Sequence, residues 1–189
     1  MGLIFSCVVM WMERLTLTVF GVLLAASVGA VLGDRLETVR ESDHELMSIF
    51  GTVGMWAIAG IVILPNLGNR EGQTVAVCMG LLLVIPEVLS RATEGRGTPA
   101  IVQRGRSLCM AAVLVLHHFP EGMAAGLGCV TDGVGAAAFC WAVVLHSIPE
   151  TMMLMPTMSD AGFGRRGGYA AAATSGIVTA IGVLIGGMI

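Results

Sequence analysis

The sequence predicts an all-α fold, a polytopic membrane bundle of six transmembrane helices, from three observations. Hydrophobic residues make up 56% of the 189-residue chain and charged residues 12%, about half the charged share of a soluble domain. The mean hydropathy is +0.86, and the chain contains no lysine. The charges leave continuous apolar runs near the ~20 residues that an α-helix needs to cross a bilayer. Soluble enzymes, disordered tails and, with a net charge of −3, nucleic-acid-binding proteins are excluded.

The apolar runs give the helices in chain order, and none alternates apolar with polar residues as a membrane β-strand would. The predicted spans are 15–33, 46–66, 72–90, 107–130, 133–158 and 167–189. Residues 1–12 are apolar but too short to span, so they either lengthen the first helix or lie at the membrane interface. The whole chain, 1–189, forms a single integral membrane domain in this interpretation, with a short glycine-containing cytoplasmic loop at 91–106.

The arginines predict the orientation. Only Arg14 and Arg70 flank the spans on one side, whereas eight arginines lie in the loops after the first, third and fifth spans. These eight are Arg35, Arg40, Arg91, Arg96, Arg104, Arg106, Arg165 and Arg166. Because positively charged loops stay in the cytoplasm, we expect a multi-pass protein of the plasma (inner) membrane with its N terminus outside. The tight connection at Asp132 makes the fourth and fifth helices an antiparallel hairpin.

These two helices carry matching octets, LHHFPEGM at 116–123 and LHSIPETM at 145–152. His117 and Glu121 are four residues apart, as are His146 and Glu150, so each pair shares a helix face. An unpaired carboxylate at mid-membrane costs several kcal/mol, so we expect the four side chains to meet inside the bundle. Two imidazoles and two carboxylates predict a divalent-metal site, with donors that suit Zn²⁺, Fe²⁺ and Mn²⁺ better than Ca²⁺ or Cu⁺.

A second ion position beside the first is a weaker prediction. His118 precedes Glu121 by three residues as Ser147 precedes Glu150, so the two carboxylates can be shared with a neighbouring ion. Pro120 and Pro149 each remove a helical hydrogen bond, and the freed carbonyls one turn before each glutamate are expected to line an ion path.

Less specific interpretations stay open for these and other residues. The His and Glu residues of the octets can form a structural polar network, and His118 a simple interhelical hydrogen bond. We expect Glu87 to snorkel toward the interface or to pair with Arg91, and His44 to lie in a solvated loop. The methionines of the fifth span are expected to pack rather than bind copper. The cysteines form no C-x-x-C pair and are interpreted as buried thiols: Cys7, Cys78, Cys109, Cys129 and Cys140.

The two octets resemble the H-N-x-P-E-G and [HQ]-[ND]-x-P-E-G signatures of the ZIP (Zrt/Irt-like) family of divalent metal transporters. Residues 50–65 and 175–182 are similar to that family's second and sixth helices. The resemblance implies a binuclear site in a transport pathway that works by an elevator-like movement. It assigns His117, Glu121, His146 and Glu150 to the primary site, and His118 and Ser147, with the same two glutamates, to the secondary site.

The chain departs from the family pattern in three ways. Family members typically have eight helices, so the six predicted here imply an incomplete chain. Thr179-Ala180 stands where Glu-Pro is frequent, and Ser147 where Asn or Asp is frequent, which weakens the secondary site. The 91–106 loop has no histidine, so no metal-sensing loop is expected.

The sequence therefore predicts a ZIP-like transporter, not an enzyme, that moves a divalent metal toward the cytoplasm through the His/Glu site. Zinc is the expected substrate, with Fe²⁺, Mn²⁺ or Cd²⁺ as alternatives. The expected partners are this ion and the lipid bilayer, without nucleic acid, and a homodimer is an open alternative for the assembly. Two other functions stay open, an intramembrane metalloenzyme and a truncated relative that binds metal without transporting it, although no H-E-x-x-H motif occurs.

Overall fold

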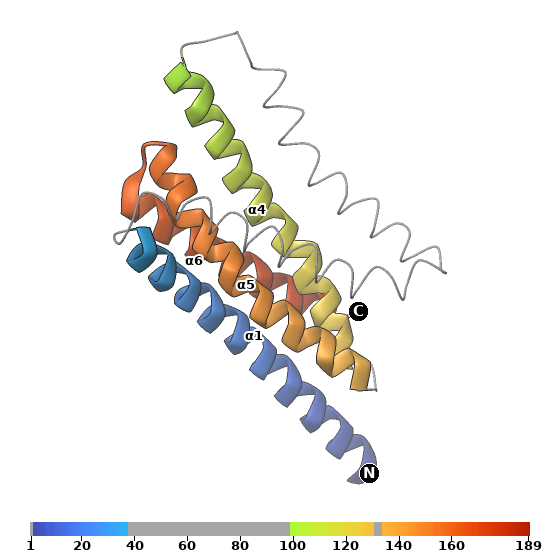
Figure 1. Ribbon diagram of the computed structural model, residues 1–189. Coiled ribbons are helices and arrows are strands. Elements are labelled where there is room, and N and C mark those ends of the chain that lie inside the picture. Colours follow the sequence, from blue (N-terminus) through green and yellow to red (C-terminus); the bar gives the residue numbers. More distant parts are fainter. Residues whose placement is uncertain (1, 38–98, 131–133) are drawn as a thin grey trace.

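The computed structural model describes residues 2–37, 99–130 and 134–189, and within them the chain is all-α. Its helices are α1 (Gly2–Glu37), α4 (Pro99–Val130), α5 (Val134–Asp160) and α6 (Gly164–Gly186). Figure 1 shows them side by side as a bundle, in which α4 packs mainly against α6, and α1 mainly against α5. The predicted spans at 46–66 and 72–90, together with His44 and Glu87, lie outside the described residues.

The helix bounds settle the uncertainty about the N-terminal apolar stretch. α1 begins at Gly2, so the stretch lengthens the first helix. α4 begins at Pro99, so residues 99–106 extend the fourth helix into what was predicted as loop. Proline is well tolerated at a first helical position because the N–H there has no intrahelical partner. The starts and ends of α5 and α6 fall within a few residues of the predicted spans.

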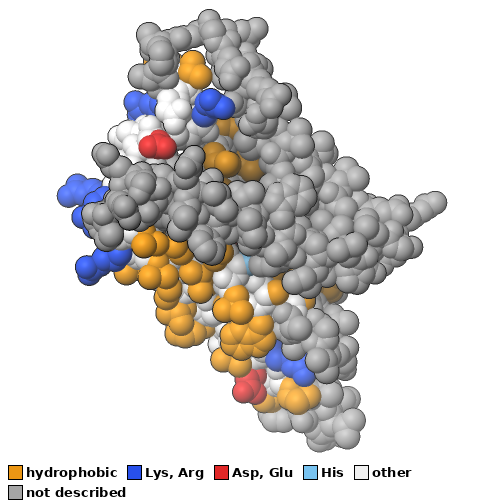
Figure 2. All heavy atoms as spheres, in the orientation of Figure 1, with side chains coloured by type: hydrophobic (Ala, Val, Ile, Leu, Met, Phe, Trp, Pro, Cys, Tyr) orange, Lys and Arg blue, Asp and Glu red, His pale blue; other side chains and the backbone are white. Residues whose placement is uncertain are grey.

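Three of the described helices contain a stretch long and apolar enough to cross a membrane: Val9–Leu36, Ile101–Val130 and Gly164–Gly186. Large apolar side chains on these helices are solvent-exposed, among them Phe20 at 64% and Leu116 at 66%. Figure 2 shows hydrophobic side chains gathered on one face of the described helices, as expected of a lipid-facing surface. The chain is thus a helical membrane protein. α5 is not among the three candidates, and the count of six spans stays a prediction.

Close contact between α4 and α6 depends on glycines spaced four apart on both helices. A Cβ atom built on Gly122 or Gly126 would collide with the α6 backbone, and one on Gly182 or Gly186 with the α4 backbone. Small residues at this spacing let two membrane helices approach until their backbones touch. The pairing of the fourth and sixth helices therefore depends on the absence of side chains along this contact.

The chain reverses direction between α5 and α6 through a turn at Gly162 that ends α5. The Phe163 N–H donates to the Met158 carbonyl at 2.9 Å, and the Gly162 N–H donates to the Ser159 carbonyl at 2.8 Å. Gly162 has φ = 83°, a left-handed conformation that glycine adopts without the steric cost of a Cβ. This geometry makes α5 and α6 antiparallel neighbours.

The ends of three helices that carry predicted cytoplasmic arginines lie together. Arg165, at the start of α6, donates two hydrogen bonds to Asp34, near the end of α1. Tyr169 Oη donates a third hydrogen bond to Asp34 at 3.0 Å. The Arg104 guanidinium of α4 lies 5.0 Å from the centre of the Phe163 ring. The side of the membrane that this end faces stays a prediction.

The bundle interior has an apolar layer on either side of its centre. One layer consists of Val22, Ala25, Ala125, Val143, Val144, Ala180 and Val183. The other consists of Ala30, Ala111, Leu114, Met153, Leu154, Met155 and Ala172. On α4 and α5, the octet residues fall between these two layers in the sequence. The fold thus places the predicted metal ligands in a polar layer enclosed by hydrophobic packing.

Candidate metal centre

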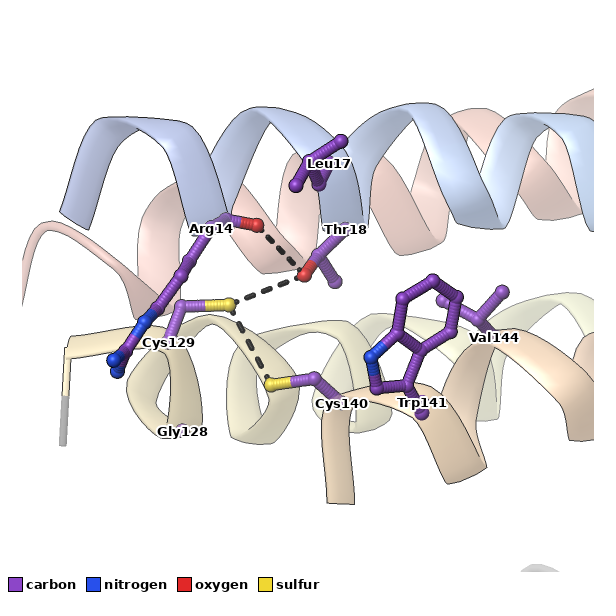
Figure 3. A pocket seen from close by; sticks show the side chains of 8 residues that line it. All are labelled: Arg14, Leu17, Thr18, Gly128, Cys129, Cys140, Trp141 and Val144. Atoms are coloured by element: carbon purple, nitrogen blue, oxygen red, sulfur yellow. Dashed lines mark hydrogen bonds between the residues drawn. The ribbon is translucent and has the colours of Figure 1, made fainter. Parts of the chain in front are cut away.

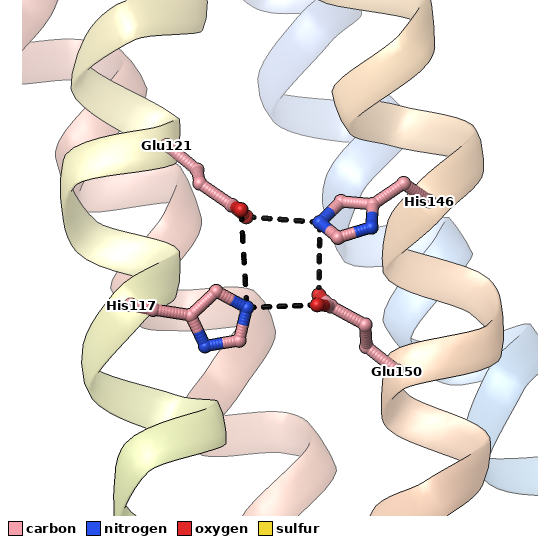
Figure 4. Close-up of side chains that lie close together, drawn as sticks. All are labelled: His117, Glu121, His146 and Glu150. Carbon is pink, nitrogen blue, oxygen red and sulfur yellow. Dashed lines mark hydrogen bonds and ion pairs between the residues drawn. The ribbon is translucent and has the colours of Figure 1, made fainter. Parts of the chain in front are cut away.

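The four predicted primary ligands meet between α4 and α5 (Figure 4). The spacing of four residues brings His117 and Glu121 to one face of α4, and His146 and Glu150 to the facing side of α5. One ligand atom from each residue can be chosen so that all four atoms lie within 4.8 Å of one another. We call these four residues the His/Glu cluster. It is a candidate metal site, and the ion that it would hold is not identified by the geometry.

The shortest contact in the cluster joins the two helices. His117 Nε2 lies 2.8 Å from Glu150 Oε1, and His146 Nε2 lies 3.1 Å from Glu121 Oε2. Within α5, His146 Nε2 is also 3.1 Å from Glu150 Oε2, whereas the corresponding His117–Glu121 distance within α4 is 3.9 Å. The within-helix pairing inferred from the sequence is therefore present, but the cross-helix pairing is at least as close.

The cluster is almost completely removed from solvent. His117 and His146 are each 3% exposed and Glu150 is 1% exposed, while the Glu121 side chain is 12% exposed. Two carboxylates this close in an apolar layer repel each other and lose their hydration, so they need compensating positive charge. A bound dication or two protons would supply it.

The Val113 carbonyl fixes how His117 can bind. His117 Nδ1 lies 3.0 Å from Val113 O, so Nδ1 carries the proton and donates it to the carbonyl. Nε2 then faces Glu150 Oε1 at 2.8 Å, where a protonated Nε2 donates a hydrogen bond to the carboxylate. Without that proton, Nε2 offers its lone pair to a metal ion. A backbone carbonyl that orients a ligating histidine is a frequent feature of metal sites. This role of the Val113 carbonyl was not predicted from the sequence, although Val113 lies four residues before His117, where its carbonyl is within reach of the imidazole.

His118 lies directly beside the cluster. Its side chain is fully buried, with Nε2 at 3.3 Å from Glu150 Oε2 and Nδ1 at 3.6 Å from Glu121 Oε2. Its ring stacks on that of His117, with centroids 4.6 Å apart. Neither ring nitrogen has a hydrogen-bond partner among the described residues. The structure therefore brings His118 within reach of both carboxylates, as a shared second position requires, and its role as a ligand stays a prediction.

The hydroxyl groups near the predicted secondary site bond within their own helices. Ser147 Oγ donates to Val143 O at 2.8 Å, and Thr179 Oγ1 donates to Ser175 O at 2.9 Å. Both side chains are buried. Each hydroxyl oxygen keeps lone pairs that can accept a hydrogen bond or ligate a metal ion. A ligand role for Ser147 therefore stays a prediction, weaker than that for the histidines and glutamates.

The prolines of the two octets lie inside continuous helices. Pro120 is within α4 and Pro149 is within α5. The leucines whose carbonyls they free, Leu116 and Leu145, have side chains 66% and 61% exposed, so these side chains face away from the cluster. That the freed carbonyls line an ion path stays a prediction.

Comparisons of the chain with protein-family models, curated proteins and solved structures find no match. The functional interpretation of the His/Glu cluster therefore rests on its own geometry and chemistry.

Proposed function

We propose that this protein transports a divalent metal ion across the membrane and that the His/Glu cluster binds the ion during transit. The observation that carries the proposal is the buried His/Glu cluster, in which one ligand atom from each of two histidines and two glutamates lies within 4.8 Å of the others. Two carboxylates in an apolar layer need compensating positive charge, and a dication neutralises both carboxylates of the cluster at once.

Zinc is the substrate that the donor set favours. Imidazole nitrogen and carboxylate oxygen in a four-donor arrangement suit Zn²⁺, and Fe²⁺, Mn²⁺ and Cd²⁺ accept similar donors. Two protonated imidazoles would neutralise the same carboxylates, so protons and metal compete for the cluster. Acid on either side of the membrane would then favour release.

Transport, rather than a structural role for the cluster, is supported by its place in the chain. Ionisable residues buried in membrane-spanning helices are costly and mark ion pathways in many membrane proteins. The resemblance of both octets to the ZIP signatures points the same way and supports uptake toward the cytoplasm through a movement of α4 and α5.

The test is zinc flux into liposomes that contain the purified chain and an entrapped fluorescent indicator. We expect zinc flux to be lost in His146→Ala/Glu150→Ala and to stay at the wild-type level in Glu13→Gln. Glu13 is an exposed carboxylate of α1, far along the chain from the His/Glu cluster. Undiminished uptake by the double variant would refute the assignment of the site. Zinc binding without flux would identify a metal-binding protein that does not transport, and hydrolysis of lipid or peptide would favour a metalloenzyme.

A further inference from the structure

A second group of metal-ligating side chains lies near the connection between α4 and α5 (Figure 3). Cys129 Sγ and Cys140 Sγ are 3.5 Å apart, and Thr18 Oγ1 of α1 lies 3.3 Å from Cys129 Sγ. Both cysteines are free thiols and are buried. We call these three residues, together with the cavity beside them, the thiol pocket.

The antiparallel pairing of α4 and α5 creates this arrangement. Cys129 is the penultimate residue of α4, and Cys140 is in the second turn of α5, so the hairpin brings opposite ends of the two helices together. The Cys140 thiol donates to the Ala125 carbonyl at 3.2 Å, which holds its sulfur toward α4. Each thiol contacts a polar group, the Thr18 hydroxyl for Cys129 and the Ala125 carbonyl for Cys140, so neither is packed among aliphatic side chains alone.

A cavity of about 150 Å³ adjoins the sulfurs. It is lined by Arg14, Leu17, Thr18, Gly128, Cys129, Cys140, Trp141 and Val144. The volume is several times the ~30 Å³ that one water occupies in the liquid, so an ion can approach the sulfurs with water molecules still attached. The guanidinium of Arg14 supplies positive charge at the cavity wall, so that thiolates formed there are not isolated negative charges.

We propose that Cys129 and Cys140 form a second metal site, for a thiophilic dication such as Cd²⁺ or Zn²⁺, with the Thr18 hydroxyl as a neighbouring oxygen donor. The geometry fits: with metal–sulfur bonds of about 2.3 Å, sulfurs at the observed separation subtend an angle of roughly 100° at the ion, close to tetrahedral. A linear two-coordinate ion would need sulfurs about 4.6 Å apart, and a disulfide needs them at about 2.05 Å. Binding releases two protons, because two thiols and a dication give a neutral dithiolate complex.

The thiol pocket is distinct from the His/Glu cluster. Cys140 precedes His146 by six residues, which is about 9 Å along a helix axis. The pocket therefore lies between the α4–α5 connection and the cluster, where it can hold an ion before or after the central site does. Its existence depends on the contacts of its own residues and does not require that the protein transports metal.

The test uses the purified full chain, reduced and titrated with Cd²⁺, and follows the ultraviolet sulfur-to-cadmium charge-transfer absorption. One variant keeps only the pair, with Cys7, Cys78 and Cys109 replaced by serine, and a matched variant carries Cys129→Ser and Cys140→Ser. We expect the pair-only variant to show a band that saturates at one ion per chain, and the matched variant to lose it. A band of equal size in the matched variant, or none in wild type, overturns the proposal.

Two further measurements keep the result interpretable. The single variant Cys140→Ser leaves four cysteines and replaces one sulfur by one oxygen, and it should lose most of the band even if the multiple variants fold poorly. The variant His146→Ala/Glu150→Ala should keep the band, which separates this site from the proposed transport site. Loss of the band in that variant, with its helical circular dichroism intact, would contradict the proposal of a separate site.

Discussion

Replacing Gly126 by alanine should destabilise the bundle, although alanine is the better helix former. A Cβ at this position would lie 2.7 Å from the Gly187 nitrogen and 2.8 Å from the Val183 carbonyl carbon, and both are backbone atoms that cannot rotate away. Helices α4 and α6 must therefore move apart along their glycine contact. Overpacking of this kind costs about 1–3 kcal/mol in free energy of unfolding.

Gly105→Ala is the matched control, because Gly105 is on the same helix and a Cβ there meets no atom within 4 Å. The gain in helix propensity is common to both substitutions and cancels when the two variants are compared. Since about 1 kcal/mol shifts the melting temperature of a chain of this size by roughly 2–4 °C, Gly126→Ala should melt about 2–12 °C below Gly105→Ala. Thermal unfolding in detergent, followed by circular dichroism, measures the difference. Equal melting temperatures would refute the close α4–α6 contact.

Three further predictions concern the polar groups. The Glu150 side chain lies within 3.3 Å of three histidines, and Glu150→Gln keeps its volume but removes its charge. Zinc affinity, measured by competition titration, should therefore fall by about 100-fold or more. The control Glu13→Gln should leave the affinity unchanged. Zinc binding should weaken on acidification, because a histidine must be deprotonated to ligate, and an affinity independent of pH would contradict imidazole ligation. Asp34→Asn should lower the free energy of unfolding, measured by urea titration, by about 1–2 kcal/mol, because Asp34 accepts hydrogen bonds from Arg165 and Tyr169. Tyr169→Phe removes only one of these bonds and should lower the free energy of unfolding by less.

The parts of the fold that depend on local periodicity could be predicted from the sequence. Helices α4 and α5, the hairpin that they form and the meeting of His117, Glu121, His146 and Glu150 all follow from apolar runs and the spacing of four residues. Their positions were predictable because a helix turns by a fixed angle per residue and because a short connection forces antiparallel neighbours.

Features that depend on which helix packs against which could not be predicted in the same way. The small residues of the sixth span predict a close helix contact, but nothing in the sequence says that the α6 glycines contact Gly122 and Gly126. The pairing of Cys129 with Cys140 was missed for a related reason. A separation of eleven residues across a turn matches no local metal-binding motif, and the thiols meet only because of the register of the hairpin.

The central claim is that the His/Glu cluster binds a divalent metal ion, and zinc K-edge X-ray absorption tests it most directly. The sample is the purified Cys129→Ser/Cys140→Ser chain loaded with one equivalent of zinc, which removes the thiol pocket from competition. We predict a first shell of nitrogen and oxygen at about 2.0–2.2 Å with the outer-shell scattering of two or more imidazoles. A first shell with sulfur near 2.3 Å, or a spectrum of hydrated zinc without imidazole scattering, would contradict the claim.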